Sequence, residues 1–492
     1  MPSAALPSDP SIPNAPVTPA ILDALRAIVG DKGLILDEHD KEPFVTDWRR
    51  SRVGQAAAIV RPANTEEVSG VVRLCHDNGI AIVPQGGNTG LMGGATPWPV
   101  HCGIVLSLGR MNHVLNVDPI GYSMTVEAGC ILKRIQETAA DHDRFFPLSL
   151  GAEGSCMIGG NLSTNAGGVQ VLRFGNARNL VLGVEVVLPN GDIWNGLRSL
   201  KKDNTGYDLK QLFVGAEGTL GIITKAVLKL WPAPKDVCTA WLAIRDPQAA
   251  LDILSGAHVA SDDNVGSCEL MSRACVDMVL RHIPGVQDPL KAETGWYLLL
   301  EWASSRPRQD GSAGMSEKME QFLADQLEAG RVLDAVIAQT QAQSHNMWRI
   351  RESVAEAQRT EGPSLSYDIS VAVSKIPDFI DNGLKAVFDI LPTIRPNPLG
   401  HIGDGNLHFS FMGPKGMDRQ TLTQYSGAIT RTVNDLITSM GGSISAEHGI
   451  GIEKMDELAR CRSKTELDIM RTIKRALDPK DIMNPGKILR LS

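Results

Sequence analysis

The sequence lacks the features that mark secreted and membrane proteins. Its eight cysteines are scattered over 492 residues and form no CxxC pair, a density too low for a disulfide scaffold. Reduced thiols in a cytosolic or organellar-matrix protein are therefore expected. No apolar run reaches the length of about 18 residues that a membrane helix needs, so no membrane span is predicted.

The chain also lacks an excess of positive charge. With 48 Lys and Arg against 56 Asp and Glu, its net charge is −8, which gives no broad basic field for nucleic acid. The run Arg49-Arg50-Ser51-Arg52 is expected to be a solvated face or an intersubunit contact. The first 20 residues are rich in Pro, Ser and Ala and resemble neither a secretory nor a mitochondrial signal. We expect this segment to be disordered and the protein to be cytoplasmic.

The arrangement of apolar strands, glycine-rich turns and helical stretches changes along the chain. A lead-in with a helix around 21–29 occupies residues 1–50, and residues 51–234 alternate short apolar strands with glycine-rich turns. Two prolines in WPAPKD, residues 231–236, indicate a domain boundary. Longer helices alternate with strands over 235–454, and a last helix in 455–492 precedes DIMNPGK. The pattern predicts an α+β or α/β protein of two or three domains.

Three glycine-rich loops lie in the first large region. VPQGGNTGLMGG, residues 83–94, could turn backbone N–H groups toward a ligand oxygen. It is neither a Rossmann fingerprint nor a P-loop, so a purely structural turn is the alternative to a phosphate site. Further glycines at 146–168 and 213–221 indicate a long ligand such as a dinucleotide. The pentapeptide LGAEG at 150–154 returns as VGAEG at 214–218.

The three loops, in this order, resemble the FAD-binding domain of the vanillyl-alcohol oxidase/p-cresol methylhydroxylase (PCMH) superfamily. The similarity continues through GHIGDGNLH, AEHGIG and DPKDIMNPGK. That combination resembles the FAD-linked D-2-hydroxyacid dehydrogenases, which include D-lactate and D-2-hydroxyglutarate dehydrogenases and a glycolate oxidase component. It implies an α+β fold with a two-lobed PCMH-type FAD-binding domain over 51–234. A cap domain with an antiparallel sheet and helices would follow over 235–454, and segment 455–492 would return to the flavin.

The resemblance implies FAD-binding residues in each loop. The first loop would cradle the pyrophosphate, the second would line the flavin and ribityl chain, and the third would flank the adenine. Asn88 stands where members with a covalent flavin commonly have histidine, so a dissociable FAD is implied. The implied residues are Gln85, Gly86, Gly87, Asn88, Thr89, Gly90, Leu91, Leu150, Gly151, Gly154, Ser155, Gly160, Ser163, Thr164, Asn165, Gly167, Gly218, Gly221, Ile222, Ile223 and, near the isoalloxazine, Asn484.

Two histidines, His401 and His408, flank a turn-like Gly-Asp-Gly-Asn. Their spacing fits neither one helix face nor one face of a single strand. A two-residue turn at Asp404-Gly405 would place them directly opposite each other, with Cβ atoms about 4.5–5.5 Å apart. Glu447 would add a third ligand, and such a set suits zinc or manganese. The resemblance favours this metal site; the alternative is that the histidines only hydrogen-bond the substrate.

Oxidation of a 2-hydroxy acid also needs a base for the hydroxyl proton and a partner for the carboxylate. His448 is the predicted base, since histidine accepts a proton near neutral pH; a structural histidine is the alternative. Arg351 matches the family motif and would bind the carboxylate at two points, with His401, His408 and Glu447 also facing the substrate. Arg349 is expected to be a solvated helix residue.

Three positions depart from the hydroxyglutarate pattern. Ser366, Ala355 and Ser410 stand where those enzymes commonly carry Lys, Thr and Asn. The loss of a lysine and two polar groups weakens the case for a second, distal carboxylate on the substrate. A smaller or less charged acid is consistent with this sequence, and the specific acid stays open.

The resemblance thus implies an FAD- and metal-dependent D-2-hydroxyacid dehydrogenase. Its flavin would be reoxidised by an electron carrier such as an electron-transfer flavoprotein or a quinone, and a homodimer is compatible with the sequence. Alternatives are an oxygen-using FAD oxidase, a glycolate oxidase-type subunit of a complex, and a flavin-binding subunit without catalysis. His448 beside the ligand triad argues against the last of these.

Overall fold

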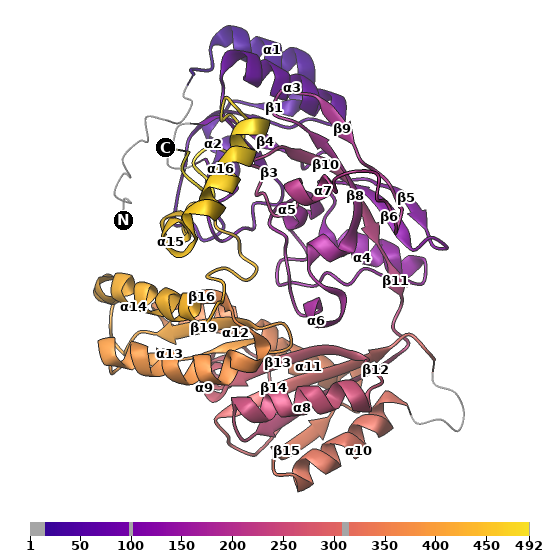
Figure 1. Ribbon diagram of the computed structural model, residues 1–492, viewed down its shortest axis with the longest axis vertical. Coiled ribbons are helices and arrows are strands. Elements are labelled where there is room, and N and C mark those ends of the chain that lie inside the picture. Colours follow the sequence, from indigo (N-terminus) through magenta and orange to yellow (C-terminus); the bar gives the residue numbers. More distant parts are fainter. Residues whose placement is uncertain (1–14, 98–101, 308–313, 492) are drawn as a thin grey trace. The chain divides into compact units, whose positions relative to one another are not determined.

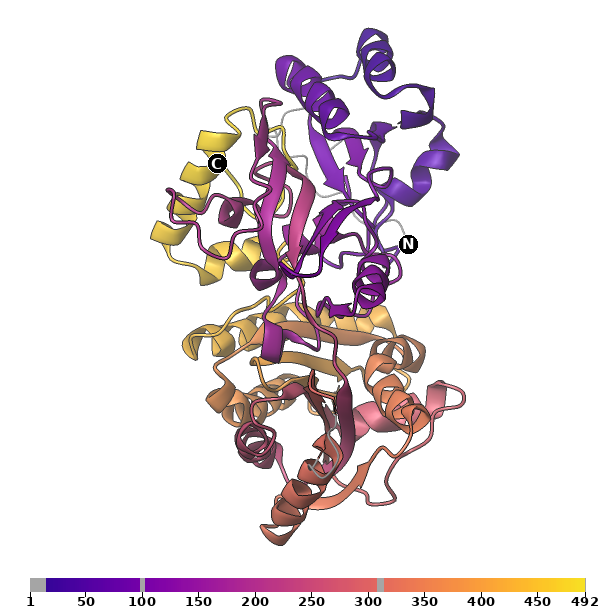
Figure 2. The same cartoon turned by 90° about the vertical axis from the view of Figure 1, so that its right-hand side faces the viewer.

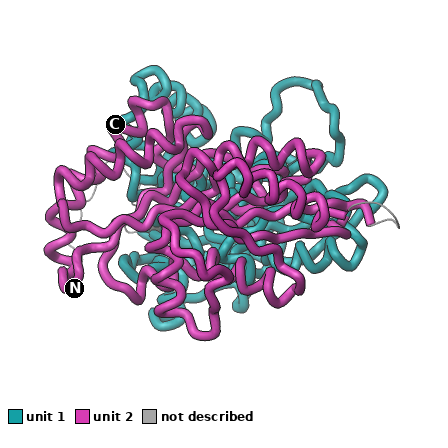
Figure 3. Tube along the Cα trace, turned by 90° about the horizontal axis from the view of Figure 1, so that it is seen from below, with its two compact units in different colours: residues 1–167, 175–232, 447–492 teal, residues 168–174, 233–446 magenta. Residues whose placement is uncertain are grey.

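The computed structural model describes residues 15–97, 102–307 and 314–491. The chain forms two compact units, the first of residues 1–167, 175–232 and 447–492 and the second of residues 168–174 and 233–446 (Figure 3). One boundary falls inside WPAPKD, whereas the other lies at 446/447, before the predicted limit at 454. Of the segment expected to be disordered, residues 1–14 lie outside the described part, and a helix already begins at Pro19.

The first lobe of the first unit is a small mixed sheet with helices. Strands β2 and β3 both pair parallel with β4, and β1 pairs antiparallel with β2. α3 begins after Asn64, whose side chain caps its first turn, and ends before Gly79, which is in the left-handed conformation. The elements are α1 (Pro19–Val29), η1 (Asp31–Gly33), β1 (Leu34–Ile35), α2 (Glu38–Val45), β2 (Ala56–Val60), α3 (Thr65–Asn78), β3 (Ile82–Gln85) and β4 (Cys102–Ser107).

The second lobe is an antiparallel sheet of five strands in the order β5-β6-β10-β8-β9. Glycine loops connect these strands to short helices, and β7 and β11 pair in a separate two-stranded ribbon. The elements are β5 (Val114–Asp118), β6 (Ser123–Glu127), α4 (Leu132–Asp141), β7 (Arg144–Phe145), α5 (Ile158–Ser163), η2 (Ala177–Leu180), β8 (Val181–Val187), β9 (Ile193–Asn195), α7 (Lys210–Phe213), β10 (Ile222–Lys229) and β11 (Trp231–Pro232).

The C-terminal segment belongs to the first unit, where α15 (Met455–Cys461) and α16 (Lys464–Leu477) appear in yellow beside the FAD-type lobes (Figures 1 and 2). Ile82 N–H donates to Ile482 O, and Asn484 N–H donates to Ile82 O, both at 2.8 Å. The tail therefore pairs with β3 at Ile82. Of the basic run, Arg52 forms an ion pair with Glu453 in this unit.

The second unit is built on one antiparallel sheet, in the order β15-β12-β14-β13-β18-β19-β16, with β17 also paired to β19 (Figure 1). α6 (Val171–Phe174) contributes from the first half of the chain, and Ser267 Oγ–H donates to Val169 O at 2.8 Å. The strands are β12 (Asp236–Ile244), β13 (Val265–Ser272), β14 (Trp296–Ser304), β15 (Val332–Ile337), β16 (Ser364–Ser370), β17 (Arg395–Pro396), β18 (Leu399–His401) and β19 (Asn406–Met412).

Alternation along the strands gives this sheet two different faces. Trp302 contacts Phe322 of α10, with ring centroids 5.5 Å apart, and Phe409 contacts Phe379 of α13 at 5.0 Å. His408 and Ser410, which alternate with Phe409, lie on the opposite face. The helices are α8 (Pro247–Ala260), α9 (Arg273–His282), α10 (Met315–Glu328), α11 (Gln341–Glu352), α12 (Val354–Glu361), η3 (Val373–Lys375), α13 (Ile376–Ile390) and α14 (Arg419–Ser439).

No helix in the described part of the chain combines the length and apolar character needed to span a lipid bilayer.

Candidate flavin cleft and polar sheet face

The glycine loops of the first unit surround a cleft with an empty volume of about 880 Å³. Residues from all three loops line it, as does the predicted base, His448. The implied FAD residues that line it are Gln85, Gly86, Gly87, Asn88, Thr89, Gly90, Gly160, Ser163, Thr164, Gly218, Gly221, Ile222 and Ile223. The remaining implied residues, Leu91, Leu150, Gly151, Gly154, Ser155, Asn165, Gly167 and Asn484, are not part of this lining.

The glycines of this cleft serve two different needs. A Cβ at Gly87 would lie 2.2 Å from Ser155 O, so glycine is needed there for the loops to pack. At Gly90 and Gly160, a Cβ would meet nothing within 4 Å. Glycines that face open space in a cleft allow a ligand to approach the backbone closely. The cleft therefore fits a long ligand such as FAD.

Three asparagine side chains in these loops and in the tail form hydrogen bonds with backbone groups of neighbouring segments. Asn88 Nδ2–H donates to Thr46 O at 2.8 Å and to Pro43 O at 3.1 Å, which ties the first loop to the end of α2. Asn165 Oδ1 accepts from Arg178 N–H at 2.9 Å. Asn484 Nδ2–H donates to Gly94 O at 2.9 Å. Backbone groups, rather than these side chains, are thus the groups presented to a ligand.

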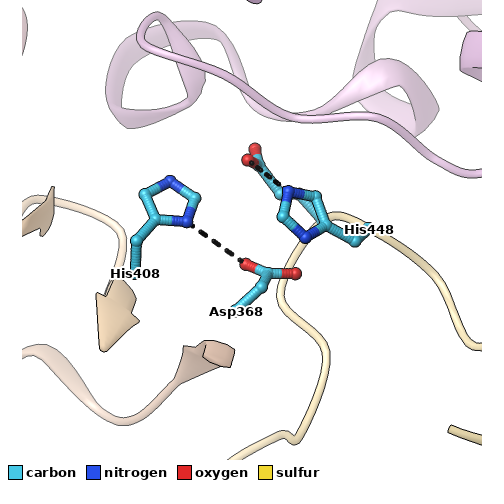
Figure 4. Close-up of side chains that lie close together, drawn as sticks. Asp368, His408 and His448 are labelled. Carbon is cyan, nitrogen blue, oxygen red and sulfur yellow. Dashed lines mark ion pairs between the residues drawn. The ribbon is translucent and has the colours of Figure 1, made fainter. Parts of the chain in front are cut away.

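The loop that carries Glu447 and His448 is fixed inside the first unit. Its backbone N–H groups at Ile450 and Gly451 donate to the carboxylate of Glu217, at 2.7 and 2.8 Å. His448 Nε2 lies 3.6 Å from Glu447 Oε1 (Figure 4). The predicted base is therefore held beside the flavin cleft by its own unit.

In the second unit, His401 and His408 lie on adjacent strands, but the predicted register was wrong. His401 pairs with Asn406, and His408 pairs with Leu399, around a loop of residues 402–405. A two-residue type I′ turn needs positive φ at both central residues, and of Asp404 and Gly405 only Gly405 has it, at 86°. The register differs from the predicted one by two positions, so both rings still share a face. They lie diagonally, with centroids 5.5 Å apart.

His401 belongs to a buried charged cluster. Its Nδ1 lies 2.7 Å from Glu269 Oε1, and Arg351 Nε–H donates to Glu269 Oε2 at 2.7 Å. The Glu269 side chain is 1% exposed. Burial alone would raise the pKa of Glu269, but His401 and Arg351 lower it below its usual range. Sequence reasoning missed Glu269, because it lies within the largely apolar strand β13.

His408 faces a second carboxylate. Asp368 lies directly opposite it in the β16–β19 pair, and His408 Nδ1 is 4.0 Å from Asp368 Oδ1 (Figure 4). Asn406 Nδ2–H donates to the same Asp368 oxygen at 2.9 Å. Asp368 was not predicted as a site residue, since only the register of two distant strands brings it to His408.

Two of the three positions that depart from the hydroxyglutarate pattern, Ser366 and Ser410, are close to this pair. Ser366 lies opposite Ser410, one pair along the same sheet face from Asp368 and His408. Gln358 Nε2–H donates to Ser366 Oγ at 3.0 Å. Ala355 is exposed on α12. Arg349 Nη2–H donates to Pro284 O at 2.8 Å and is not on this face.

Comparison with known proteins places this architecture in a family. The FAD binding domain model matches residues 56–196, and the model for the C-terminal domain of FAD linked oxidases matches residues 233–488. Proteins that are 34–38% identical to it over at least 94% of its length are named D-2-hydroxyglutarate dehydrogenases. The chain belongs to the FAD-linked D-2-hydroxyacid dehydrogenase family. It is therefore an FAD-dependent oxidoreductase, which confirms the resemblance read from the sequence.

Full-length relatives support this assignment. The chain is 38% identical to the mitochondrial D-2-hydroxyglutarate dehydrogenase of Arabidopsis thaliana, over 94% of this chain and 80% of that protein. The mitochondrial enzyme of the same name from Bos taurus is 37% identical over 97% and 85%. The D-2-hydroxyglutarate dehydrogenase of Stutzerimonas stutzeri is 34% identical over 96% and 99%.

Solved structures establish the fold. Substrate-bound p-cresol methylhydroxylase superposes with a TM-score of 0.73 at 18% identity, over 95% of this chain and 96% of that one. Alkyldihydroxyacetonephosphate synthase superposes with a TM-score of 0.71 at 19% identity, over 96% and 86%. The predicted PCMH-type α+β architecture is thus confirmed.

Proposed function

We propose that this enzyme oxidises a D-2-hydroxy acid to the 2-oxo acid. The observation that carries the proposal is the position of His448 on the lining of the glycine-rich cleft, within one unit. FAD, held there without a covalent bond, would supply the acceptor for the hydride at N5. His448 would take the hydroxyl proton, a role for which histidine suits near neutral pH.

The α-carboxylate needs a cationic partner, which we assign to Arg351. Its side chain is 11% exposed and is oriented by the bond from Nε–H to Glu269. A guanidinium can engage a carboxylate through two parallel N–H donors. His401, His408 and Glu447 remain the other proposed substrate contacts.

We further propose a divalent metal, zinc or else manganese, with His401, His408 and Glu447 as ligands. His401 has one feature of a metal ligand, because its Nδ1 is directed at the carboxylate of Glu269, as is common for a metal-binding histidine. Its other nitrogen, Nε2, lies 3.4 Å from Arg351 Nη2, so the guanidinium would have to move aside for an ion. Asp368 offers a further ligand oxygen beside His408. Such an ion would supply a Lewis acid for the substrate oxygens.

The chain itself limits how far Glu447 can lie from these residues. Ser443 pairs with Ser370 of β16 in the second unit. Glu447 follows four residues later and is therefore within about 14 Å of that strand, since a residue spans at most about 3.5 Å. This covalent tether supports a ligand set that includes both histidines and Glu447.

The specific acid and the electron acceptor are open. D-2-hydroxyglutarate is favoured by the names of the relatives, whereas Ser366 and Ser410 favour an acid without a distal carboxylate. An electron-transfer flavoprotein or a quinone is our proposed acceptor, in a protein that functions as a monomer or homodimer. Cytoplasmic location stays a prediction, because the names of two relatives place those proteins in mitochondria.

An anaerobic bleaching screen tests the proposal. The purified yellow protein is mixed with the D- and L-forms of lactate, malate, 2-hydroxyglutarate and longer 2-hydroxy acids, and flavin absorbance is followed. We expect bleaching by one or more D-acids and by none of the L-acids. Persistent yellow colour with every D-acid would refute the dehydrogenase proposal, and rapid reoxidation by air would favour the oxidase or glycolate oxidase-type alternative.

A further inference from the structure

The repeated pentapeptide of the glycine loops gives its two glutamates different partners. In the first copy, Glu153 Oε1 accepts from Leu150 N–H at 3.2 Å and from Gln136 Nε2–H at 3.1 Å, which closes its own loop. In the second copy, Glu217 accepts from Ile450 and Gly451, more than two hundred residues along the chain. The first copy therefore stabilises its own loop, whereas the second copy holds a segment that is distant in the sequence.

The contacts of Glu217 act on the segment just after His448. Each carboxylate oxygen accepts one backbone N–H, from Ile450 at 2.7 Å and from Gly451 at 2.8 Å. Gly449 passes so close that a Cβ on it would lie 2.7 Å from Glu217 Oε1. Two charge-assisted hydrogen bonds and this close approach leave the backbone beside His448 little freedom.

Glu217 is also where the loops of the flavin cleft meet. Its own N–H donates to Ser163 O at 2.8 Å, and its carbonyl accepts from Asn484 Nδ2–H at 2.8 Å. Asn484 Nδ2–H also donates to Gly94 O. Glu217 itself lines the cleft and has a left-handed φ of 50°. Glu217 therefore links the second and third glycine loops, the C-terminal tail and the segment that follows His448.

We propose that Glu217 is a positioning residue that fixes the loop of His448 against the flavin cleft. It couples the conformation of the cofactor loops to the placement of the base. The expected effect on catalysis rests on the proposed role of His448. The clamp, meaning the two hydrogen bonds from Ile450 N–H and Gly451 N–H to Glu217, does not depend on that role.

Hydrogen–deuterium exchange of the holoenzyme tests the clamp directly, without any substrate. In E217Q, one carboxylate oxygen becomes an NH₂ group that cannot accept, so one backbone N–H loses its partner. A buried N–H without an acceptor is unfavourable, so exchange over residues 447–454 should rise about tenfold. The matched variant E153Q, in the other copy of the pentapeptide, should leave exchange in that segment unchanged.

A second variant reaches the same clamp from the opposite side. In G449A the new Cβ collides with Glu217 at a backbone φ of 78°, so exchange over 447–454 should rise as in E217Q. Gly330 has φ of 66° with open space around it, so G330A reports the cost of the backbone conformation alone. Exchange in E217Q and G449A equal to that of the wild type would overturn the clamp.

The catalytic consequence is read from anaerobic flavin reduction, with the limiting rate measured separately from the substrate concentration that gives half of that rate. With a D-2-hydroxy acid that the enzyme oxidises, E217Q should lower the limiting rate about 10- to 100-fold and leave the half-saturating concentration nearly unchanged. E153Q should leave the limiting rate of its FAD-loaded fraction unchanged. A wild-type limiting rate in E217Q, despite faster exchange, would refute the positioning role; if no acid reduces the flavin, the proposed function fails while exchange still decides the clamp.

Discussion

The rings of His401 and His408 are diagonal neighbours on adjacent strands, with centroids 5.5 Å apart and planes at 76°. Each has a buried carboxylate beside it, Glu269 for His401 and Asp368 for His408. Buried carboxylates cost free energy unless they are paired. His401 Nδ1 is held by Glu269 at 2.7 Å, whereas His408 Nδ1 lies 4.0 Å from Asp368, beyond hydrogen-bond distance.

Replacing His448 should abolish flavin reduction while FAD remains bound. In H448N the proposed general base is lost, and loss of a general base typically costs about 10²- to 10⁴-fold in rate. The measurement is the rate of anaerobic bleaching at saturating D-acid, with FAD content from the visible spectrum. His258, which pairs with Asp263 at 2.8 Å on the surface of the second unit, supplies the control H258N, expected to reduce its flavin at the wild-type rate. A similar loss in both variants would argue against the proposed base.

Replacing Glu269 should weaken both the cluster and metal binding. In E269Q the buried Arg351 loses its anionic partner, which typically costs about 3–5 kcal/mol of unfolding free energy. Loss of the carboxylate that orients His401 should lower metal affinity about 10- to 100-fold. Denaturant unfolding and metal analysis after dialysis measure the two effects.

Glu301 provides a matched control for this variant. It is another largely buried carboxylate of the same sheet, bonded by Trp348 Nε1–H at 2.7 Å and Thr239 Oγ1–H at 2.9 Å. Burial raises the pKa of Glu301. E301Q should retain its metal, so equal metal content in E269Q and the wild type would exclude His401 as a ligand.

Introducing a cation beside His408 should shift substrate preference toward a dicarboxylic acid. In S366K with S410N, the lysine lies one pair from Asp368 and His408 on the same face. We expect kcat/KM for D-2-hydroxyglutarate relative to D-lactate to rise about tenfold or more, the effect of roughly 1.4 kcal/mol from a new charge-assisted bond. S364K, one pair farther along the same face, should leave the ratio unchanged. An equal shift in both would point to a general charge effect.

Acid should destabilise the second unit through Glu361. Burial raises the pKa of Glu361, but Arg395, His282 and Arg281 outweigh this effect and lower the pKa to about 2. A carboxyl group whose pKa is lower in the folded state stabilises the fold at pH values above its unfolded-state pKa of about 4.3. That stabilisation, at most about 3 kcal/mol, is lost as the pH falls toward 2. Unfolding midpoints of the wild type should therefore fall more steeply below about pH 4.5 than those of E361Q; parallel curves would contradict this assignment.

Local sequence predicted much of the first unit. The glycine loops lie around one cleft, because glycine permits the turns and close approaches wherever it stands. α3 lies between its caps, Asn64 and Gly79, and one limit of the first compact unit falls within WPAPKD. These features depend on residues that are near one another in the chain.

The polar face of the second unit depended on partners far apart in the sequence. Glu269, His401, Asp368 and His408 come from four strands whose register is set by long-range pairing. The hairpin illustrates this, since Val371 N–H donates to Gly405 O and Leu172 packs against Gly403. Neither contact can be foreseen from the turn residues alone.

Short contiguous motifs were enough to identify the family, the flavin loops and the two histidines that meet. The carboxylate that faces each histidine and the glutamate that holds the His448 loop became apparent only in the folded chain. The physical reason is that strand register and loop anchoring minimise the free energy of the whole fold, through contacts whose partners no local pattern specifies.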